Sequence, residues 1–500
     1  MQLTLKFLNI IFTLLSIYFI KNFLHLYQLK DYNNARYLNH LISKKLFYIL
    51  SLFVLTILLN FVSNLLFKLI IFIFSIILNI IFNLTLINSK KTPIKYTNKL
   101  IRLYLISSIF MCFSLFFDNY LLISQILIII IPISANFFNI YDKIKNYYFI
   151  KIAQKKLKNS NTKIIAITGS NGKTSVKNIL QSILSSQYKV QATPASFNTS
   201  LGISKFINQN LKQDCDFVIL EYGARRRKDI KNLCKTFGAD YGILTTIAPQ
   251  HLQTFHSLEN IIEAKSELPN FLKNKLCIFN ADNHFCKEIY NNKIGEKKCI
   301  SIKKKTDIYA SNITIENFQT KFKLHINNYT KEVTTNLLGE HNVTNILLAS
   351  ALSLNLGITI ENIVATISSL QQTPHRLEYI KSHINILDDS YNCSIESAKQ
   401  SIQVLNLTKY KTMVVTPGII EGGKNQYKLN FQLGKMLTNL DFVIIVGATN
   451  KKAILSGIKS QHYKCKIILS KTLEESKKYF KLLNQNDCLL LLNDLPDDYN

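Results

Sequence analysis

The feature that most constrains the fold of this chain is a strand, a glycine loop and a helix in direct succession. Residues 163–168 form a short apolar run typical of a buried strand, and a helical pattern opens at Lys173. The loop between them holds two glycines, which let backbone N–H groups approach an oxyanion closely at the start of a helix. We therefore predict a nucleotide-phosphate site made of Thr168, Gly169, Ser170, Asn171, Gly172, Lys173, Thr174 and Ser175.

Two side chains of this loop have specific roles in the prediction. Lys173 is expected to reach the β- and γ-phosphates, and the hydroxyl of Thr174 is expected to bind Mg²⁺. The usual phosphate-loop pattern carries glycine five residues before its Gly-Lys pair, where this chain has Ile167. A chance turn is the alternative, but the strand before it and the helix after it favour a phosphate site.

Strand and helix patterns alternate along the chain after residue 160. Short β-rich runs separated by helical patterns indicate a parallel sheet with crossover helices. The pattern pauses near residue 370, so we predict a P-loop parallel-sheet ATPase domain over 161–370 and a Rossmann-like α/β domain over 371–500. The expected strands are residues 163–168, 217–221, 241–246 and 276–280 in the first domain, and 384–388, 412–416, 442–447, 466–469 and 488–492 in the second.

The first 140 residues are dominated by Ile, Leu and Phe. Because soluble helices rarely stay apolar on all faces, transmembrane helices are expected here rather than a buried all-helical domain. Basic loops within residues 21–45 and 89–102 place the later domains in the cytoplasm by the positive-inside rule. The sequence thus predicts a multi-pass anchor over 1–140 in the bacterial inner membrane, with the lipid bilayer as partner, and a basic connector helix over 141–160. The expected spans are residues 5–20, 46–67, 69–86, 103–117 and 120–138.

The formal net charge of +29 raises the question of nucleic-acid binding. The lysines are scattered along the chain and no nucleic-acid module is visible, so no nucleic-acid partner is expected. The nine cysteines include no CxxC pair. This pattern argues against a disulfide framework or a zinc site, and for a reducing compartment.

Three further residues are weak candidates when each is taken alone. Glu221 closes an expected strand, and a carboxylate at the carboxyl end of a parallel strand faces the nucleotide crevice. It is placed to hold magnesium, although a solvated Glu is the commoner case at a strand end. His251 follows the strand over 241–246, where histidines are more often capping or core residues. Lys265 lies in a helical pattern, where lysines are usually solvated.

Together these residues stand in blocks whose order resembles that of the Mur ligase family. The resemblance covers residues 160–500 and is carried by the blocks 168–174, 221–224, 251–252 with 263–267, 339–345, 375–378 and 387–392. Within the family, the stretches 388–392, 415–418 and 493–497 resemble the ligases that add D-alanyl-D-alanine to UDP-N-acetylmuramoyl tripeptide.

The resemblance implies an ATP-dependent amide-bond ligase of peptidoglycan precursor synthesis. Its substrates would be the nucleotide-linked muramoyl peptide and D-Ala-D-Ala, joined through an acyl phosphate with ATP and two Mg²⁺ ions. Catalysis would rest on Lys173, Glu221, His251 and Lys265, with metal held by Thr174, Glu221, His251 and a carbamoylated Lys265. ATP would also contact Asn342, Asn345 and Arg376, and the other substrates would contact Asn198, Thr199, Asp388, Asp389, Tyr391 and Asn392.

Two other functions stay open at this point. A related ligase with another acceptor fits the same chemistry, since the expected spans occupy the place of the family's uridine-binding domain. A membrane transport ATPase would need charged residues inside its spans, and none lies at the centre of an expected span. Residues 388–392 are also compatible with an ordinary strand-to-helix turn capped by Asp.

Overall fold

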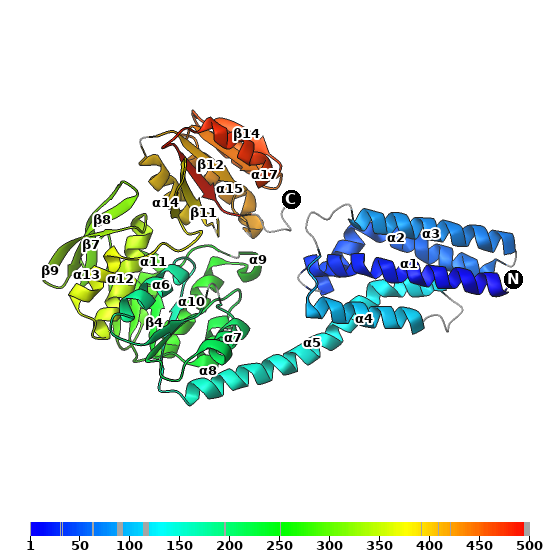
Figure 1. The fold of residues 1–500 in the computed structure, drawn as a ribbon, viewed down its shortest axis with the longest axis horizontal. Coiled ribbons are helices and arrows are strands. Elements are labelled where there is room, and N and C mark those ends of the chain that lie inside the picture. Colours follow the sequence, from blue (N-terminus) through cyan, green and yellow to red (C-terminus); the bar gives the residue numbers. More distant parts are fainter. Residues whose placement is uncertain are drawn as a thin grey trace. The chain divides into compact units, whose positions relative to one another are not determined.

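The structure is a computed structural model that describes residues 2–494, except 31, 33, 63–64, 88–93, 114–119, 195–196, 251, 392, 409 and 421. It divides into two compact units, Met1–Tyr147 and Tyr148–Asn500, and Figure 1 labels many of their elements. His251 and Asn392 of the predicted site lie outside the described residues, as do residues 495–497 of the predicted family-specific tail.

Long helices make up the described part of the first unit (Figure 1). Apolar side chains from all of them meet in one buried cluster that includes Leu24, Tyr27, Tyr37, Phe82 and Leu103. The helices are α1 (Gln2–Leu29), α2 (Asn34–Phe61), α3 (Leu65–Ile87), α4 (Asn98–Phe113) and α5 (Tyr120–Lys158).

The prediction of transmembrane spans is wrong for the described residues, because no helix there combines the length and the apolar character needed to cross a membrane. A crossing takes about 20 apolar residues. Helix α4 has 16 residues, α1 contains Lys21, Asn22 and His25, and α5 contains Pro132 and turns polar beyond it. The finding also contradicts the predicted multi-pass location in the inner membrane, and it leaves the lipid bilayer unsupported as a partner.

Helix α5 runs without a break to Lys158, so the residues predicted as a separate connector are the last part of this helix. Within the second unit, its Ala153 and Leu157 are buried in a core that also contains Phe206 and Leu211. The amide of Gln154 donates a hydrogen bond to the carbonyl of Thr236 (2.9 Å). This segment therefore packs on the elements of the second unit that follow it.

The predicted parallel sheet opens the second unit. Its strand order is β2-β3-β1-β4-β5-β6-β7-β8-β9, parallel as far as β7 and antiparallel from β7 to β9. The strands are β1 (Lys163–Thr168), β2 (Val190–Ala192), β3 (Phe217–Glu221), β4 (Tyr241–Leu244), β5 (Cys277–Asn280), β6 (Lys297–Ser301), β7 (Ile308–Glu316), β8 (Gln319–Ile326) and β9 (Tyr329–Thr335).

Helices cover both faces of this sheet. Alternate residues of β1 point to opposite faces, so that Ile165 and Ile167 pack with α6, α12 and α13, while Ala166 packs with α7, α8, α10 and α11. The helices are α6 (Lys173–Leu184), α7 (Ser200–Asn210), α8 (Asp229–Phe237), α9 (Leu252–Phe255), α10 (Leu258–Leu272), α11 (His284–Asn292), α12 (Glu340–Asn355) and α13 (Ile360–Ser368).

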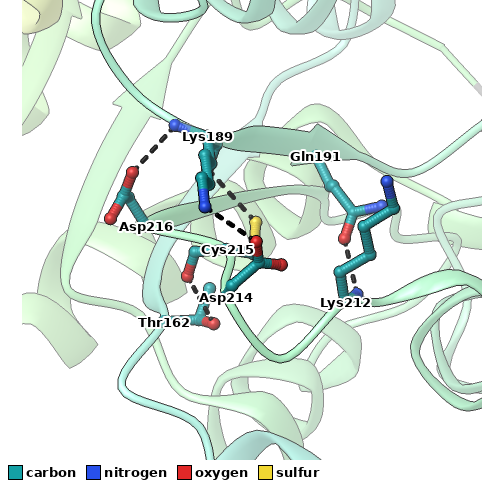
Figure 2. A network of polar contacts seen from close by, with 7 residues as sticks. All are labelled: Thr162, Lys189, Gln191, Lys212, Asp214, Cys215 and Asp216. Carbon is teal, nitrogen blue, oxygen red and sulfur yellow. Dashed lines mark hydrogen bonds and ion pairs between the residues drawn. The ribbon is translucent and has the colours of Figure 1, made fainter.

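The amino ends of β1, β2 and β3 are tied together by polar contacts, which Figure 2 shows. The backbone N–H of Lys189 donates to Asp216 (2.8 Å), its ammonium pairs with Asp214 (2.8 Å), and the Thr162 hydroxyl donates to the Cys215 carbonyl (2.8 Å). These contacts fix the start of each strand. Glu221 and Thr168 therefore emerge at the opposite, carboxyl edge of the sheet.

A second sheet occupies the rest of the chain, as predicted. Its order is β10-β11-β15-β12-β13-β14, and only the pairing of β10 with β11 is antiparallel in the described residues. The strands are β10 (Glu378–Lys381), β11 (Asn385–Asp389), β12 (Thr412–Thr416), β13 (Phe442–Val446), β14 (Lys466–Ser470) and β15 (Cys488–Leu492). The helices are α14 (Ile395–Asn406), η2 (Gly423–Asn425), α15 (Gln426–Met436), α16 (Lys451–Lys459), α17 (Leu473–Ser476) and η3 (Lys477–Leu482).

Candidate active site

The glycine loop joins the carboxyl end of β1 to the start of α6. Gly169 has a φ of +149°, and a Cβ there would lie 1.9 Å from Oγ1 of Thr245. Gly172 has a φ of +84°, and a Cβ there would lie 2.6 Å from Oδ1 of Asn345. Both positions therefore require glycine, for backbone conformation and for space.

Neighbouring loops hold the two residues between these glycines. The backbone N–H of Ser170 donates to the carbonyl of Thr246 (2.7 Å), and the Ser170 hydroxyl donates to the carbonyl of Ala248 (3.0 Å). The amide of Gln250 donates to Oδ1 of Asn171 (2.6 Å). The loop is thus a fixed cradle at the amino end of a helix, which is the arrangement that binds phosphate.

Lys173 begins α6 and folds back over the loop. Its ammonium donates to the carbonyls of Gly169 (2.7 Å) and Ser170 (2.9 Å). Burial lowers the pKa of Lys173 below its ordinary value. A cation held this close to the loop is placed to meet the phosphates that the loop would bind.

Thr174 and Glu221 meet beneath the loop. The Thr174 hydroxyl donates to Oε2 of Glu221 (2.9 Å), and the Asn198 amide donates to Oε1 (3.2 Å). Both Thr174 and Glu221 are buried. The hydroxyl proton points to Glu221 and one lone pair accepts a long hydrogen bond from Arg376 (3.4 Å), so one lone pair of the hydroxyl oxygen stays available. A hydroxyl and a carboxylate oxygen are ligands that Mg²⁺ prefers, so this pair fits a magnesium ion.

Lys177, one turn beyond Thr174 on α6, was not among the predicted site residues. Its ammonium lies 3.7 Å from Oε2 of Glu221, and the two side chains are each 2% exposed. A lysine in a helical pattern is usually solvated, so the sequence carried no signal for this residue. The structure makes it a third partner of the Glu221 carboxylate.

Lys265 lies on α10 and lines the same cavity as the loop. It is buried, and burial, followed by the nearby charge of Lys173, holds its pKa well below the ordinary value. The neutral amine favoured by this environment is the form that reacts with CO₂ to give a carbamate.

The turn before β10 brings Arg376 to the loop. Nη2 of Arg376 donates to the Thr174 hydroxyl oxygen (3.4 Å), and its guanidinium carbon lies 4.3 Å from the centre of the Tyr391 ring. Both neighbours of Arg376 have left-handed backbones, with φ of +60° at His375 and +52° at Leu377. His375 is fixed in turn by a 2.7 Å contact between its Nδ1 and Oδ2 of Asp388. These contacts hold the turn that presents Arg376.

Four other predicted residues are buried and do not line the cavity. Asn342 and Asn345 are buried at the start of α12, where the Asn345 amide donates to Asn342 (3.2 Å). Neither lines the cavity; Asn345 instead supports Gly172 from behind. Asp388 and Asp389 are also buried, and Asp389 accepts a hydrogen bond from the Ser401 hydroxyl (2.5 Å). Burial raises the pKa of Asp389 to about 6.

One cavity of about 560 Å³ collects most of these groups. It is lined by residues 169–174 of the loop, residues 198–200, Glu221, Lys265, Arg376 and Tyr391. Thr199, predicted as a substrate contact, also caps α7 by accepting a hydrogen bond from the N–H of Gly202 (3.2 Å). Arg225 and Phe255 line the cavity without having been predicted.

The chain is similar to known proteins over most of its second unit. Residues 167–353 match the family described as Mur ligase middle domain. The UDP-N-acetylmuramoyl-tripeptide–D-alanyl-D-alanine ligase of Buchnera aphidicola is 33% identical over 351 residues, which are 68% of this chain and 74% of that relative.

Two solved structures extend the similarity to the fold. MurF from Acinetobacter baumannii is 26% identical, with a TM-score of 0.62 over 70% of this chain and 77% of its own. MurF ligase from Thermotoga maritima in complex with ADP has a TM-score of 0.63 over 70% of this chain and 80% of its own, and at 24% identity it bears on the fold alone. With a relative 33% identical over three quarters of its length, this chain belongs to the Mur ligase family.

Proposed function

We propose that this chain is an ATP-dependent ligase that joins D-alanyl-D-alanine to the peptide carboxyl of a UDP-N-acetylmuramoyl tripeptide. The observation that carries the proposal is the convergence of Lys173, Thr174, Glu221 and Arg376 around one cavity, in a chain 33% identical to a ligase of that name. These groups come from two domains, which suits an enzyme that assembles its site around bound substrates.

The reaction has two steps. A carboxylate oxygen of the acceptor attacks the γ-phosphorus of ATP, the bond to the β,γ-bridging oxygen breaks, and ADP leaves with that electron pair. The amine of D-Ala-D-Ala then attacks the carbonyl carbon of the acyl phosphate. Phosphate leaves with the carboxylate oxygen, and the amine releases a proton. Lys173 and Arg376 contribute positive charge to the phosphoryl transfer, which depends chiefly on positioning and charge neutralisation.

Mg²⁺ would be held by Thr174 and Glu221, the buried oxygen pair beneath the loop. When bound, it would neutralise phosphate charge and orient the γ-phosphoryl group. A second ion would use Lys265 as a carbamate, together with His251. Carbamoylation joins the neutral amine to CO₂ and releases a proton, which replaces a repelling ammonium by an oxygen ligand. Lys265 lies 3% exposed beside the charge of Lys173, an environment that favours the neutral amine this reaction needs.

The two substrates would occupy different parts of the cavity. Asn198 and Thr199 are proposed to contact the acceptor, since their loop lines the cavity beside Glu221. Tyr391 lines it from the C-terminal domain and would face the incoming amine. Asp388, Asp389 and Asn392 are proposed as support for that side; the buried Asp389 would act through the turn that carries Tyr391.

Phosphate release under selective omission of substrates tests the proposal. Full-length protein is given ATP and Mg²⁺ with the nucleotide tripeptide, with D-Ala-D-Ala, with both or with neither. Sustained release is expected only with both substrates, and Lys173→Ala is expected to abolish it. Lys189→Ala, which removes an exposed lysine at the other edge of the sheet, is expected to keep it. Equal release from ATP alone would contradict the ligase function.

A further inference from the structure

Four consecutive basic residues, Arg225-Arg226-Arg227-Lys228, follow β3. All four are exposed, and Arg225 lines the cavity of the candidate active site. The loop begins four residues after Glu221, so its position relative to the reacting groups is set by the same strand. This basic run has no role in the proposed reaction steps.

Carboxylates from two helices fix the backbone of this loop. Oδ2 of Asp229 accepts hydrogen bonds from the N–H groups of Arg225 (3.0 Å) and Arg226 (2.9 Å). The carboxylate of Glu267 on α10 accepts from the N–H groups of Lys228 (2.6 Å) and Lys231 (2.7 Å). The loop is therefore ordered before any ligand binds, which lowers the entropic cost of using its side chains for recognition.

The same arrangement leaves positive charge unmatched at the cavity. Arg227 forms an ion pair with Glu263. Among the residues that the structure describes, neither the Arg225 guanidinium nor the Arg226 guanidinium forms an ion pair. The acids that line the cavity are Asp229 and Glu221. Asp229 accepts from backbone N–H groups, and Glu221 contacts the side chains of Thr174, Asn198 and Lys177. An exposed guanidinium with no acidic partner is suited to bind a carboxylate or a phosphate.

The rest of the cavity indicates which substrate meets Arg225. The phosphate loop and Arg376 already provide for the triphosphate of ATP. Leu233, Phe255 and Ile261 also line the cavity and form its apolar part. An acceptor that combines apolar stems with an anionic group fits such a lining.

We infer that Arg225 binds an anionic group of the acceptor that does not react. The inference rests on the proposed function, because it assigns part of that acceptor to this loop. A nucleotide-linked tripeptide carries two such groups: the diphosphate of its UDP moiety, and the carboxylate of any acidic residue within the peptide. Both are oxyanions that an arginine fork can bind through paired hydrogen bonds.

Steady-state kinetics of the full-length protein test this assignment. Arg225→Ala is expected to raise the KM for the acceptor by about tenfold or more, as the loss of a charged hydrogen bond implies. The KM for ATP should stay unchanged, and Arg225→Lys should restore part of the loss. Arg227→Ala is the matched control, because Arg227 is adjacent and exposed but pairs with Glu263 and does not line the cavity.

Comparing the KM of Arg225→Ala for three acceptors identifies which anionic group Arg225 binds. These are the UDP-linked tripeptide, the same compound with its non-reacting peptide carboxylate amidated, and the muramoyl tripeptide without the nucleotide. If the effect of Arg225→Ala disappears with the amidated acceptor, the partner is the peptide carboxylate. If it disappears without the nucleotide, the partner is the diphosphate.

Three outcomes would overturn the inference. They are an unchanged acceptor KM in Arg225→Ala, an equal increase in Arg227→Ala, and an Arg225→Ala effect of the same size with all three acceptors. In each case the wild type still ligates the UDP-linked tripeptide, so the proposed function stands. Failure of the wild type to ligate that acceptor would instead remove the proposed function, and this inference with it.

Discussion

The ammonium of Lys177 lies 3.7 Å from Oε2 of Glu221, in a pair whose side chains are each only 2% exposed. Thr174 and Asn198 donate to the same carboxylate. Glu221 is therefore held from three sides, and the buried positive charge of Lys177 compensates its negative charge. Removal of one member of such a pair leaves the other charge buried without compensation.

Lys177→Met is expected to lower the free energy of unfolding by about 3 kcal/mol, the usual cost of breaking a buried ion pair. Adding Glu221→Gln should recover much of that loss, because the uncompensated charge is then removed as well. Chemical denaturation of the two single variants and the double variant measures the coupling. Lys189→Met, which breaks an exposed pair with Asp214, should have little effect. Additive losses in the double variant would show that the two side chains do not interact.

Gly172→Ala is expected to lower kcat/KM for ATP by about 100-fold, because misplacement of a catalytic group by 1 Å can cost that much. The new Cβ would lie 2.6 Å from Oδ1 of Asn345, and φ at this position is +84°. Gly357→Ala is the control for backbone strain alone. Its φ of +91° is as unfavourable for alanine as that of Gly172, but its Cβ would meet no close neighbour, because the nearest atom is the Tyr188 hydroxyl at 3.5 Å. It should reduce stability and leave the KM for ATP unchanged. Normal kinetics in Gly172→Ala would remove this loop from the mechanism.

The ring of Tyr391 is expected to hold Arg376 in place for phosphoryl transfer. Tyr391→Ala should lower kcat by about tenfold, which corresponds to the loss of one cation–π contact. Tyr391→Phe keeps the ring and should keep kcat. Arg376→Lys should cost more than either, since lysine has neither the fork nor the flat stacking surface. A lower kcat in Tyr391→Phe would contradict this role of the ring, and a higher KM for D-Ala-D-Ala would show that the hydroxyl also contacts the incoming amine.

The buried carboxyl of Asp389 should make stability depend on pH. Its pKa is raised to about 6 in the folded state, above a value of about 3.9 in the unfolded chain. The folded protein thus favours the protonated carboxyl. This group's contribution to the free energy of unfolding is complete below the pKa in the unfolded chain, about 3.9, and is lost as the pH rises through the folded-state pKa of about 6. The loss in the free energy of unfolding amounts to about 3 kcal/mol. Melting temperatures of the wild type should fall relative to Asp389→Asn between pH 4 and 7, and a difference constant across that range would contradict the shift.

Carbamoylation of Lys265 predicts a response to bicarbonate. Activity of the wild type should fall when CO₂ is depleted and return when bicarbonate is added, because the carbamate forms reversibly. Lys265→Ala should be inactive, and Lys265→Glu should recover part of the activity by supplying a carboxylate. ¹³C-labelled CO₂ should give a carbamate signal in NMR spectra of the wild type that is missing from Lys265→Ala. An active wild type without that signal would contradict the modification.

Local patterns predicted the parts of the site that lie close together in the sequence. The strand–loop–helix at 163–175 and the position of Glu221 at a strand end both rest on short-range rules, and the structure has both. The hairpins β7 to β9 were not predicted although they join consecutive strands through two-residue turns. The close approach of Asn345 to Gly172 depends on distant packing, which no local pattern shows. Lys177 was missed for the same reason, because only the fold brings it to Glu221.

The predicted membrane spans illustrate the limit of composition. Apolar residues dominate the first unit, but Leu24, Tyr27 and Phe82 are buried where helices pack against one another. Polar residues such as Asn22 and His25 are buried there as well. An apolar sequence therefore indicates how much surface must be buried. It does not distinguish burial by lipid from burial by neighbouring helices.

The most direct test of the acyl phosphate follows one oxygen atom. The acceptor tripeptide is labelled with ¹⁸O in its reacting carboxylate, and the full-length protein is given ATP, Mg²⁺ and D-Ala-D-Ala. The proposed mechanism predicts ADP, an amide product and inorganic phosphate that carries ¹⁸O, because the carboxylate oxygen that attacks the γ-phosphorus leaves with the phosphate. Unlabelled phosphate would contradict the mechanism, since it would show that water had attacked ATP instead.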